Sequence, residues 1–272
     1  QGTRPGGGVP TVGMKGFYNA TLDSQGRNPG AKVDSENFYG SKGDFEDVEA
    51  DMFTARIEHD FTPTLTLRNT TRFGTTKQHY LLTGVNALGN LGPATAPTDP
   101  SVWNVARTRQ GKYQENDILT NQTNLTAQFD TGSVKHSLST GLEFIYEKQN
   151  SPTYALVGVT QGPANLYNPS LGDTFVDPVR NGAYNNGNTT TAAIYAFDNM
   201  ELTPQWELNA GLRLEHYQTD FSGASLSTAT SNPTLPVGTL VPATGKASDN
   251  LVSWKLGVVY KPAPHGSIYA AA

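Results

Sequence analysis

The strongest constraint on the fold is an alternation of side-chain character through residues 55–73, ARIEHDFTPTLTLRNTTRF. Because successive side chains of a β-strand point to opposite faces, this pattern indicates two strands, each with one apolar and one polar face. Only Thr-Pro-Thr at 62–64 separates them, which predicts an antiparallel hairpin. Its apolar face includes Ile57, Phe61, Leu65, Leu67 and Phe73, and its polar face includes Arg56, Glu58, Arg68 and Arg72.

Similar patterns identify eight strand-like segments, and no segment has a sustained helical period. The segments are 46–61, 64–83, 114–129, 133–149, 190–202, 205–221, 249–261 and 266–272. Short turns alternate with long connections between them. The expected loops are 84–113, 150–189, 222–248 and most of 1–45, all rich in Gly, Pro, Asn or Ser.

This alternation of connection lengths indicates a particular kind of β-structure. Consecutive antiparallel strands place every second connection at the same edge of a sheet, so all the long loops lie at one edge. Short turns at one rim and long loops at the other are typical of outer-membrane β-barrels. We therefore predict an all-β fold, an antiparallel transmembrane barrel sector with long extracellular loops and short periplasmic turns.

Aromatic positions support the same prediction. One aromatic residue on the apolar face lies beside each short turn, as an interfacial girdle requires. These residues are Phe61, Phe129, Trp206 and Tyr260. From Phe53 to Phe61 the strand spans roughly 26 Å, close to the roughly 25 Å apolar band of such barrels. Tyr80, Tyr146 and Tyr217 are expected near an outer girdle or the bases of the loops.

Charged side chains are expected on the other face, towards the lumen. They are Arg56, Glu58, Arg68, Arg72, Glu143, Glu147, Arg213, Glu215 and Lys255. An eight-stranded barrel has an interior just wide enough for side chains, so this many charges favours a sector of a wider, wetter barrel. A small barrel with a salt-bridged core and a soluble β-sandwich with one wet face stay open as alternatives.

Composition excludes several other classes. The formal net charge is −5 and no Lys/Arg run occurs, which argues against a nucleic-acid partner. Cysteine is absent, so disulfides and thiolate metal sites are excluded. No apolar run approaches the roughly 18 residues of a transmembrane helix. The first residues read like the middle of a loop and the last like a shortened strand, so we expect a segment of a longer protein.

Several stretches together resemble one family, the TonB-dependent siderophore receptors of the catecholate type. They are NFYG at 37–40, RIEHDF at 56–61, LRNTTR at 67–72, ILTNQTNLTAQFDTG at 118–132, STGLEF at 139–144, AIYAFDNMELT at 193–203 and WELNAGLRLEHY at 206–217. The resemblance covers nearly the whole chain and is weakest in the loops.

The resemblance implies a bacterial outer-membrane receptor whose barrel has about 22 strands around a plug domain. It implies binding of ferric catecholate siderophores at the extracellular side and uptake energised through the TonB complex. Iron would arrive already chelated, so no cofactor or protein metal site is expected. Residues 1–272 would then be a partial barrel domain without the plug, the TonB box or the C-terminal strands. Its partners would be a ferric siderophore, the TonB complex and outer-membrane lipid.

Aromatic and cationic side chains in the expected extracellular loops are candidates for contact with an anionic, aromatic ligand. They are Phe38, Tyr39, Tyr80, Trp103, Arg107, Arg109, Tyr167, Arg180 and Tyr184. Trp103, Arg107 and Arg109 form the sharpest hypothesis, a cluster at the ligand vestibule. The alternative is that these side chains pack the loops together or lie in the interface belt, and loop architecture is favoured for NFYG.

The remaining function classes are an outer-membrane barrel enzyme and an adhesive or structural barrel. The histidines have no metal-ligand spacing, and we expect His59, His136 and His216 at the membrane interface. In the Glu58–His59–Asp60 stretch the histidine points away from both acids, so no nucleophile–base pair is predicted there. We predict no catalytic residues.

Overall fold

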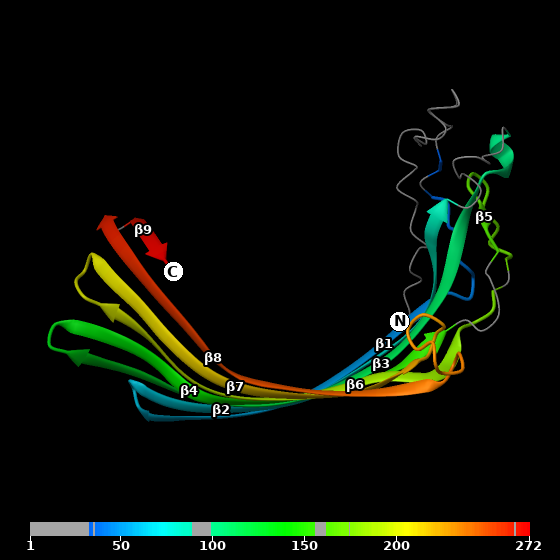
Figure 1. Ribbon diagram of the computed structural model, residues 1–272. Helices are drawn as coiled ribbons and strands as arrows, with labels where there is room; N and C mark the ends of the chain where they lie inside the picture. The colour runs from blue at the N-terminus through cyan, green and yellow to red at the C-terminus, as the bar shows by residue number, and fades with distance from the viewer. Residues whose placement is uncertain (1–32, 35, 89–98, 156–161, 174, 264) are drawn as a thin grey trace.

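The computed structural model describes residues 33–34, 36–88, 99–155, 162–173, 175–263 and 265–272. They form one curved antiparallel sheet (Figure 1). The predicted all-β antiparallel fold is confirmed. The described residues contain a short 3₁₀ turn, Pro100–Val102. No helix in this described part of the chain is long and apolar enough to cross a membrane.

The strands follow one another across the sheet in the order β1-β2-β3-β4-β6-β7-β8-β9, and the short β5 pairs with β3. Their bounds are β1 Phe45–Thr62, β2 Leu65–Leu88, β3 Asn104–Thr131, β4 Val134–Ala155, β5 Ala164–Asn165, β6 Val179–Glu201, β7 Trp206–Leu226, β8 Leu240–Ala263 and β9 Gly266–Ala271.

All eight predicted strands are present, but the sheet reaches further at its long-loop end than the sequence predicted. The expected loops 84–113, 150–189 and 222–248 were wrong in part, because β-structure occupies 84–88, 104–113, 150–155, 164–165, 179–189, 222–226 and 240–248. The physical reason is reciprocal pairing. Where two neighbouring strands extend equally far, the backbone groups of each strand form hydrogen bonds with those of the other. Polar and Gly-rich residues therefore remain in β-structure there.

The connections are sorted by length, as predicted. Short turns join β1 to β2, β3 to β4, β6 to β7 and β8 to β9 at one end of the sheet, and the long connections lie at the other end (Figure 1). In the β3–β4 turn, Gly132 has a φ of +64°, which suits a residue without a Cβ.

The ladder fixes which side chains share a face. Partners in an antiparallel pair lie on the same side, and Glu58 is opposite Arg68, which is opposite Asn124. Continuing across the sheet, the register places all nine predicted charges on one side, called here the polar face. The other side is called the apolar face.

The apolar face is uncovered in the structure. Ile57 is 73% exposed and Trp254 is 63% exposed, and their large neighbours are similarly open. Phe61, Phe129, Trp206 and Tyr260 lie on this face beside the short turns, with the Trp206 and Tyr260 rings 4.5 Å apart. Of the three tyrosines expected further out, Tyr146 lies on the apolar face, whereas Tyr80 and Tyr217 lie on the polar face. An exposed apolar surface of this size marks an interaction site for a membrane or for another protein.

Packing on the polar face depends on two glycines that lie under aromatic rings. A Cβ at Gly141 would meet the Tyr195 hydroxyl at 2.7 Å and the Thr123 carbonyl oxygen at 2.2 Å. The Tyr195 hydroxyl in turn accepts hydrogen bonds from Gln122 and Asn124, each at 3.1 Å. Gly211 lies under the Phe197 ring in the same way. The absent side chains let the rings lie flat on the strands.

We predict that Gly141→Ala destabilises the purified protein by about 1–3 kcal/mol, because the added methyl group collides with backbone as well as with the Tyr195 ring. The matched control is Gly84→Ala, whose Cβ would meet nothing within 4 Å. Thermal unfolding, followed by heat-dependent gel mobility and circular dichroism, measures both. Equal midpoints for the two variants would contradict the packing argument.

Candidate functional site

At the long-loop end of the sheet, three chain segments pack together into a cluster, called here the loop clamp. It consists of 37–44 before β1, 162–177 before β6, and 103–109 at the start of β3. Its apolar centre contains buried side chains from all three segments and from Val33. They are Val33, Tyr39, Trp103, Val105, Ala164 and Leu166. Leu166 also extends the pairing of β5 by donating its backbone N–H to the Trp103 carbonyl at 2.7 Å.

Arg107 joins the three segments through its guanidinium group. It donates to the carbonyl oxygens of Tyr39 at 3.2 Å, Gly162 at 3.0 Å and Pro163 at 3.2 Å. The carboxylate of Asp173 is 2.7 Å away and completes the set. Because the Arg107 side chain is almost fully buried, these contacts replace the water that it loses on folding.

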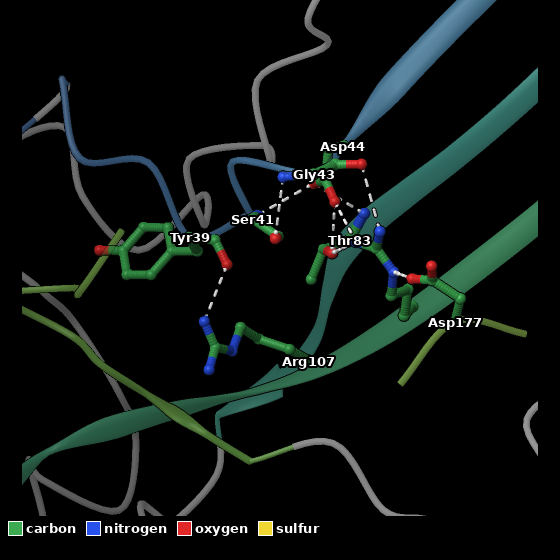
Figure 2. Close-up of polar contacts among 8 residues, drawn as sticks. Tyr39, Ser41, Gly43, Asp44, Thr83, Arg107 and Asp177 are labelled. Carbon is green, nitrogen blue, oxygen red and sulfur yellow. Dashed lines mark hydrogen bonds and ion pairs between the residues drawn. The ribbon is translucent and has the colours of Figure 1, made fainter. Parts of the chain in front are cut away.

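Arg109 forms the second joint of the clamp, and Figure 2 labels its partners Asp44, Thr83 and Asp177. It pairs with Asp44, and both side chains are at most 3% exposed. Asp44 also accepts from the Thr83 backbone N–H at 3.0 Å and hydroxyl at 2.8 Å, which ties the segment before β1 to β2. On its other side Arg109 reaches Asp177 at 2.6 Å. A buried pair of this kind is tolerated only when its remaining donors and acceptors are satisfied, as they are here.

Asp173, Phe175 and Asp177, from one short loop, contact the two arginines. Phe175 lies under them, with its ring centroid 4.6 Å from the Arg107 guanidinium carbon and 5.6 Å from that of Arg109. The Asp173 and Asp177 carboxylates flank it, and Asp177 is 58% exposed. These cation–π contacts and ion pairs hold the segment 173–177 against β3.

Tyr39 links the apolar centre to its polar rim. Its hydroxyl donates to the Leu166 carbonyl at 2.5 Å and lies 3.5 Å from the Asn37 amide, which also reaches Leu166. Burial raises the pKa of the Tyr39 phenol, so the neutral hydrogen-bonding form persists well beyond neutral pH.

The register shows which side of the sheet the clamp covers. Arg109 is opposite Thr83, and Leu119 is opposite Phe73, with no register shift between the two pairs. Arg109 is ten residues from Leu119 along β3, and Thr83 is ten residues from Phe73 along β2. Because ten is an even number, Arg109 lies on the same face as the apolar Leu119 and Phe73. Arg107 shares this face. The clamp therefore continues the apolar face beyond its apolar band rather than lining the polar face.

The structure separates the nine candidate residues into three groups. Phe38, Tyr39, Trp103, Arg107, Arg109 and Tyr167 belong to the clamp or lie against it, and Trp103 and Tyr167 pack with ring centroids 6.1 Å apart. Arg180 and Tyr184 lie on the apolar-face side of β6, where Arg180 is 5.1 Å from the Tyr113 ring. Tyr80 alone of these nine lies on the polar face. Ligand contact stays a prediction for all of them.

The polar face contains a hollow of about 480 Å³ near its long-loop end, which the sequence analysis did not single out. Its lining is rich in amides and hydroxyls. The polar-face residues around it include Asn116, Glu147, Gln149, Asn185, Thr189 and Thr219. Residues 185–189 are Asn, Gly or Thr at every position, a composition equally typical of loops, so the sequence predicts a loop there.

Histidines on the apolar face have hydrogen-bonding and ring contacts there. His136 Nδ1 lies 2.6 Å from Asp198, its Nε2 lies 2.6 Å from the Thr131 hydroxyl, and the Phe129 ring stacks on it at 4.7 Å. This hydroxyl–imidazole–carboxylate chain ties the β3–β4 turn to β6. Over the described part of the chain, no three His, Cys, Asp or Glu side chains are grouped as metal ligands would be.

Residues 2–272 match the family described as TonB dependent receptor-like, beta-barrel. The chain is 41% identical to the catecholate siderophore receptor Fiu of Escherichia coli K12 over 99% of its own length and 36% of that protein. It thus spans about a third of the relative's length.

Solved structures agree. The open form of the ferric-catecholate import receptor Fiu from E. coli K12 superposes with a TM-score of 0.85 at 37% identity, over 99% of this chain and 42% of that one. The siderophore receptor PiuA from Acinetobacter baumannii gives 0.73 at 24% identity, over 97% and 37%, and so shows the shared fold.

We predict that Arg109→Gln opens the clamp, because it leaves the buried Asp44 carboxylate without its cation, a loss of about 3–5 kcal/mol. Limited proteolysis with mass-spectrometric mapping should show new cleavage within 162–177. Arg180→Gln is the control, because Arg180 is exposed and outside the clamp. An unchanged cleavage pattern in Arg109→Gln would show that the ion pair does not hold the loop.

Proposed function

Because the chain belongs to the TonB dependent receptor-like, beta-barrel family, as the sequence resemblance predicted, we propose that it forms barrel wall and extracellular loops of a receptor importing ferric catecholate siderophores. The supporting observation is the likeness to Fiu along 99% of the chain, loops included, with a TM-score of 0.85. The family is one of transport receptors.

In this proposal the apolar face lies against outer-membrane lipid. Its exposed Phe, Leu and Ile side chains would then be covered, and the turn-side aromatics would lie at the periplasmic interface. The nine charges avoid the cost of about 2–4 kcal/mol that a cation on the lipid face incurs at mid-depth. Lipid covering also explains why a sheet this apolar on one side needs no second protein layer.

The polar face would then line the lumen, against a plug domain contributed by the rest of the full-length receptor. On this face Arg213 forms ion pairs with Glu143 and Glu215, whose carboxylate oxygens each lie 2.6 Å from the same guanidinium nitrogen. The TonB complex would act through that plug. Iron would enter already chelated, and the protein itself would supply no metal site or cofactor.

Ligand recognition would combine two kinds of candidate residue. Tyr80 lies on the polar face near the level of the hollow, and in this proposal it would contact the ligand directly. Trp103, Arg107 and Arg109, proposed contributors to the vestibule, are engaged within the clamp and would act by holding the loops in place. A catecholate complex offers aromatic rings and negative charge, which tyrosine and cationic groups suit.

A barrel enzyme is disfavoured as the function. Catalysis needs a nucleophile and base together with a site that accepts substrate and stabilises its developing charge. His59 lies on the apolar face, while Glu58 and Asp60 lie on the polar face, so that stretch forms no acid–base group. We propose that the Thr131–His136–Asp198 chain has a structural role in fastening the turn.

The first test is import by the full-length receptor. A strain that lacks its other catecholate receptors should grow with a ferric catecholate as sole iron source only when it carries the receptor and an active TonB system. A ferric hydroxamate should not support this growth. Receptor-independent growth, or growth on the hydroxamate alone, would overturn the proposed substrate class.

The second test concerns direct contact. Tyr80→Ala should weaken ferric catecholate binding to the full-length receptor roughly two- to ten-fold, because one aromatic face is lost. Tyr146→Ala is the matched control, since Tyr146 lies on the apolar face. Fluorescence quenching by the ferric complex measures both affinities. Equal affinity in the two variants would remove Tyr80 from the contact set.

A further inference from the structure

The hollow on the polar face lies inside the sheet, at the level where the apolar band of the other face ends. That band stops at Leu119 and Tyr146, which are paired in register. Asn116 and Gln149 are also paired, lie three residues further towards the long loops, and line the hollow. In the proposed orientation the hollow is therefore at the extracellular end of the lumen, within reach of an entering ligand.

The space in the hollow exists because its central position has no side chain. Gly187 of β6 is paired with Gln149 on one side and with Phe221 on the other. Among the described residues, a Cβ at Gly187 would meet one atom within 4 Å, the Asp220 carbonyl oxygen at 3.7 Å. Unlike Gly141, this glycine is not covered by a ring. A side chain added at Gly187 would therefore enter the hollow without displacing the ladder.

Three polar side chains around this space are unengaged. Glu147, Gln149 and Asn185 form no hydrogen bond or ion pair through their side chains with any other residue that the structure describes. Their neighbours differ, because the Thr189 and Thr219 hydroxyls lie 2.8 Å apart and bond to each other. A carboxylate accepts hydrogen bonds, and an amide both donates and accepts them. Two adjacent strands thus present one acceptor and two mixed groups to the same space.

The charge of the hollow is negative and comes from one side chain. Of its charged lining residues, Asp117 and Lys148 lie on the apolar-face side, and Glu147 lies on the polar face. Inward, the first polar-face cation is Arg72, one row away on β2, and outward it is Lys112, three rows away on β3. The hollow therefore does not suit the anionic iron centre of a catecholate complex. It favours an uncharged ligand group that donates hydrogen bonds.

Apolar surface completes the lining. Ile118 of β3 and Phe221 of β7 lie on opposite sides of the hollow. The Phe221 ring extends over Gly223, where a Cβ would meet its Cζ at 2.7 Å, and the residue is 39% exposed. A sugar ring has hydroxyl groups around its edge and C–H groups on its faces. The edge matches the amides and the carboxylate, and the faces match the isoleucine and the phenylalanine.

We propose that this hollow binds a polyhydroxylated, sugar-type group carried by the ferric catecholate ligand. The inference rests on the proposed function, because it adds a second contact region for the same ligand. Tyr80 lies two rows outward of Thr76, about 14 Å along β2, so a ligand of that span places a catechol ring at Tyr80 and its sugar in the hollow. The sugar hydroxyls would donate to Glu147 and exchange hydrogen bonds with Gln149 and Asn185.

Binding of two matched ferric complexes to the full-length receptor tests this site. The probes are one catecholate siderophore and the same siderophore with a glucose attached to its catechol ring, and fluorescence quenching measures both affinities. The unaltered receptor should bind the glucosylated complex about ten-fold more tightly, the effect of two ordinary hydrogen bonds. Gln149→Ala/Asn185→Ala should reduce this preference to less than about two-fold and keep the affinity for the plain complex, because neither amide has a partner to lose.

The matched control is Gln128→Ala/Asn209→Ala, two amides of the same face near the short turns, and it should keep the preference. Gly187→Leu fills the hollow and should also abolish the preference. Equal affinity of the unaltered receptor for the two complexes, or an unchanged preference in Gln149→Ala/Asn185→Ala, would overturn the sugar site and leave the proposed function standing. Binding of neither complex would overturn the proposed function, and the sugar site with it.

Discussion

Every feature of this molecule depends on the antiparallel hydrogen-bond ladder keeping its register across the sheet. Because side chains alternate along a strand, a slip of one residue would exchange the two faces completely. The register instead aligns Glu58 with Arg68, and it keeps Arg213 on the same side as its ion-pair partners Glu143 and Glu215. The opposite side is then free to be apolar, and the separation of faces follows from pairing rather than from any single strong contact.

The same ladder carries the site. β2 and β3 continue as a paired extension well past the apolar band, and the clamp is fastened to that extension by Arg107, Arg109 and Thr83. Loops built on a rigid sheet extension can be positioned without a domain of their own. The clamp combines an apolar centre with arginines whose donors are satisfied.

Sequence was most informative where the period of two was uninterrupted. Residues 55–73 determined both faces of the first hairpin, and the same argument placed the nine charges correctly. It failed at the long-loop ends, where stretches such as 104–113 and 240–248 contain Gly, Asn and Thr that are equally common in loops. Their strand state depends on a neighbour that extends equally far, and local composition does not report that neighbour.

The candidate residues show a second limit. Arg107 and Arg109 were recognisable as unusual cations, but their partners Asp173, Asp44 and Asp177 are 66, 65 and 68 residues away in the sequence. No local pattern links such positions, so a packing role and a ligand role look alike until the chain is folded. The hollow on the polar face was missed because its residues come from five strands, β2, β3, β4, β6 and β7.

The even spacing between the clamp and the apolar band also limits how such a chain can change in length. Adding one residue to β3 between Arg109 and Leu119 would turn both arginines to the opposite face, away from Asp44 and the loop they hold. Adding two residues would only raise the clamp by one row, about 7 Å along the strand. Strand lengths in receptors built on this plan should therefore drift in steps of two, or gain a bulge to absorb an odd step, whereas the connections beyond the ladder can change by any number.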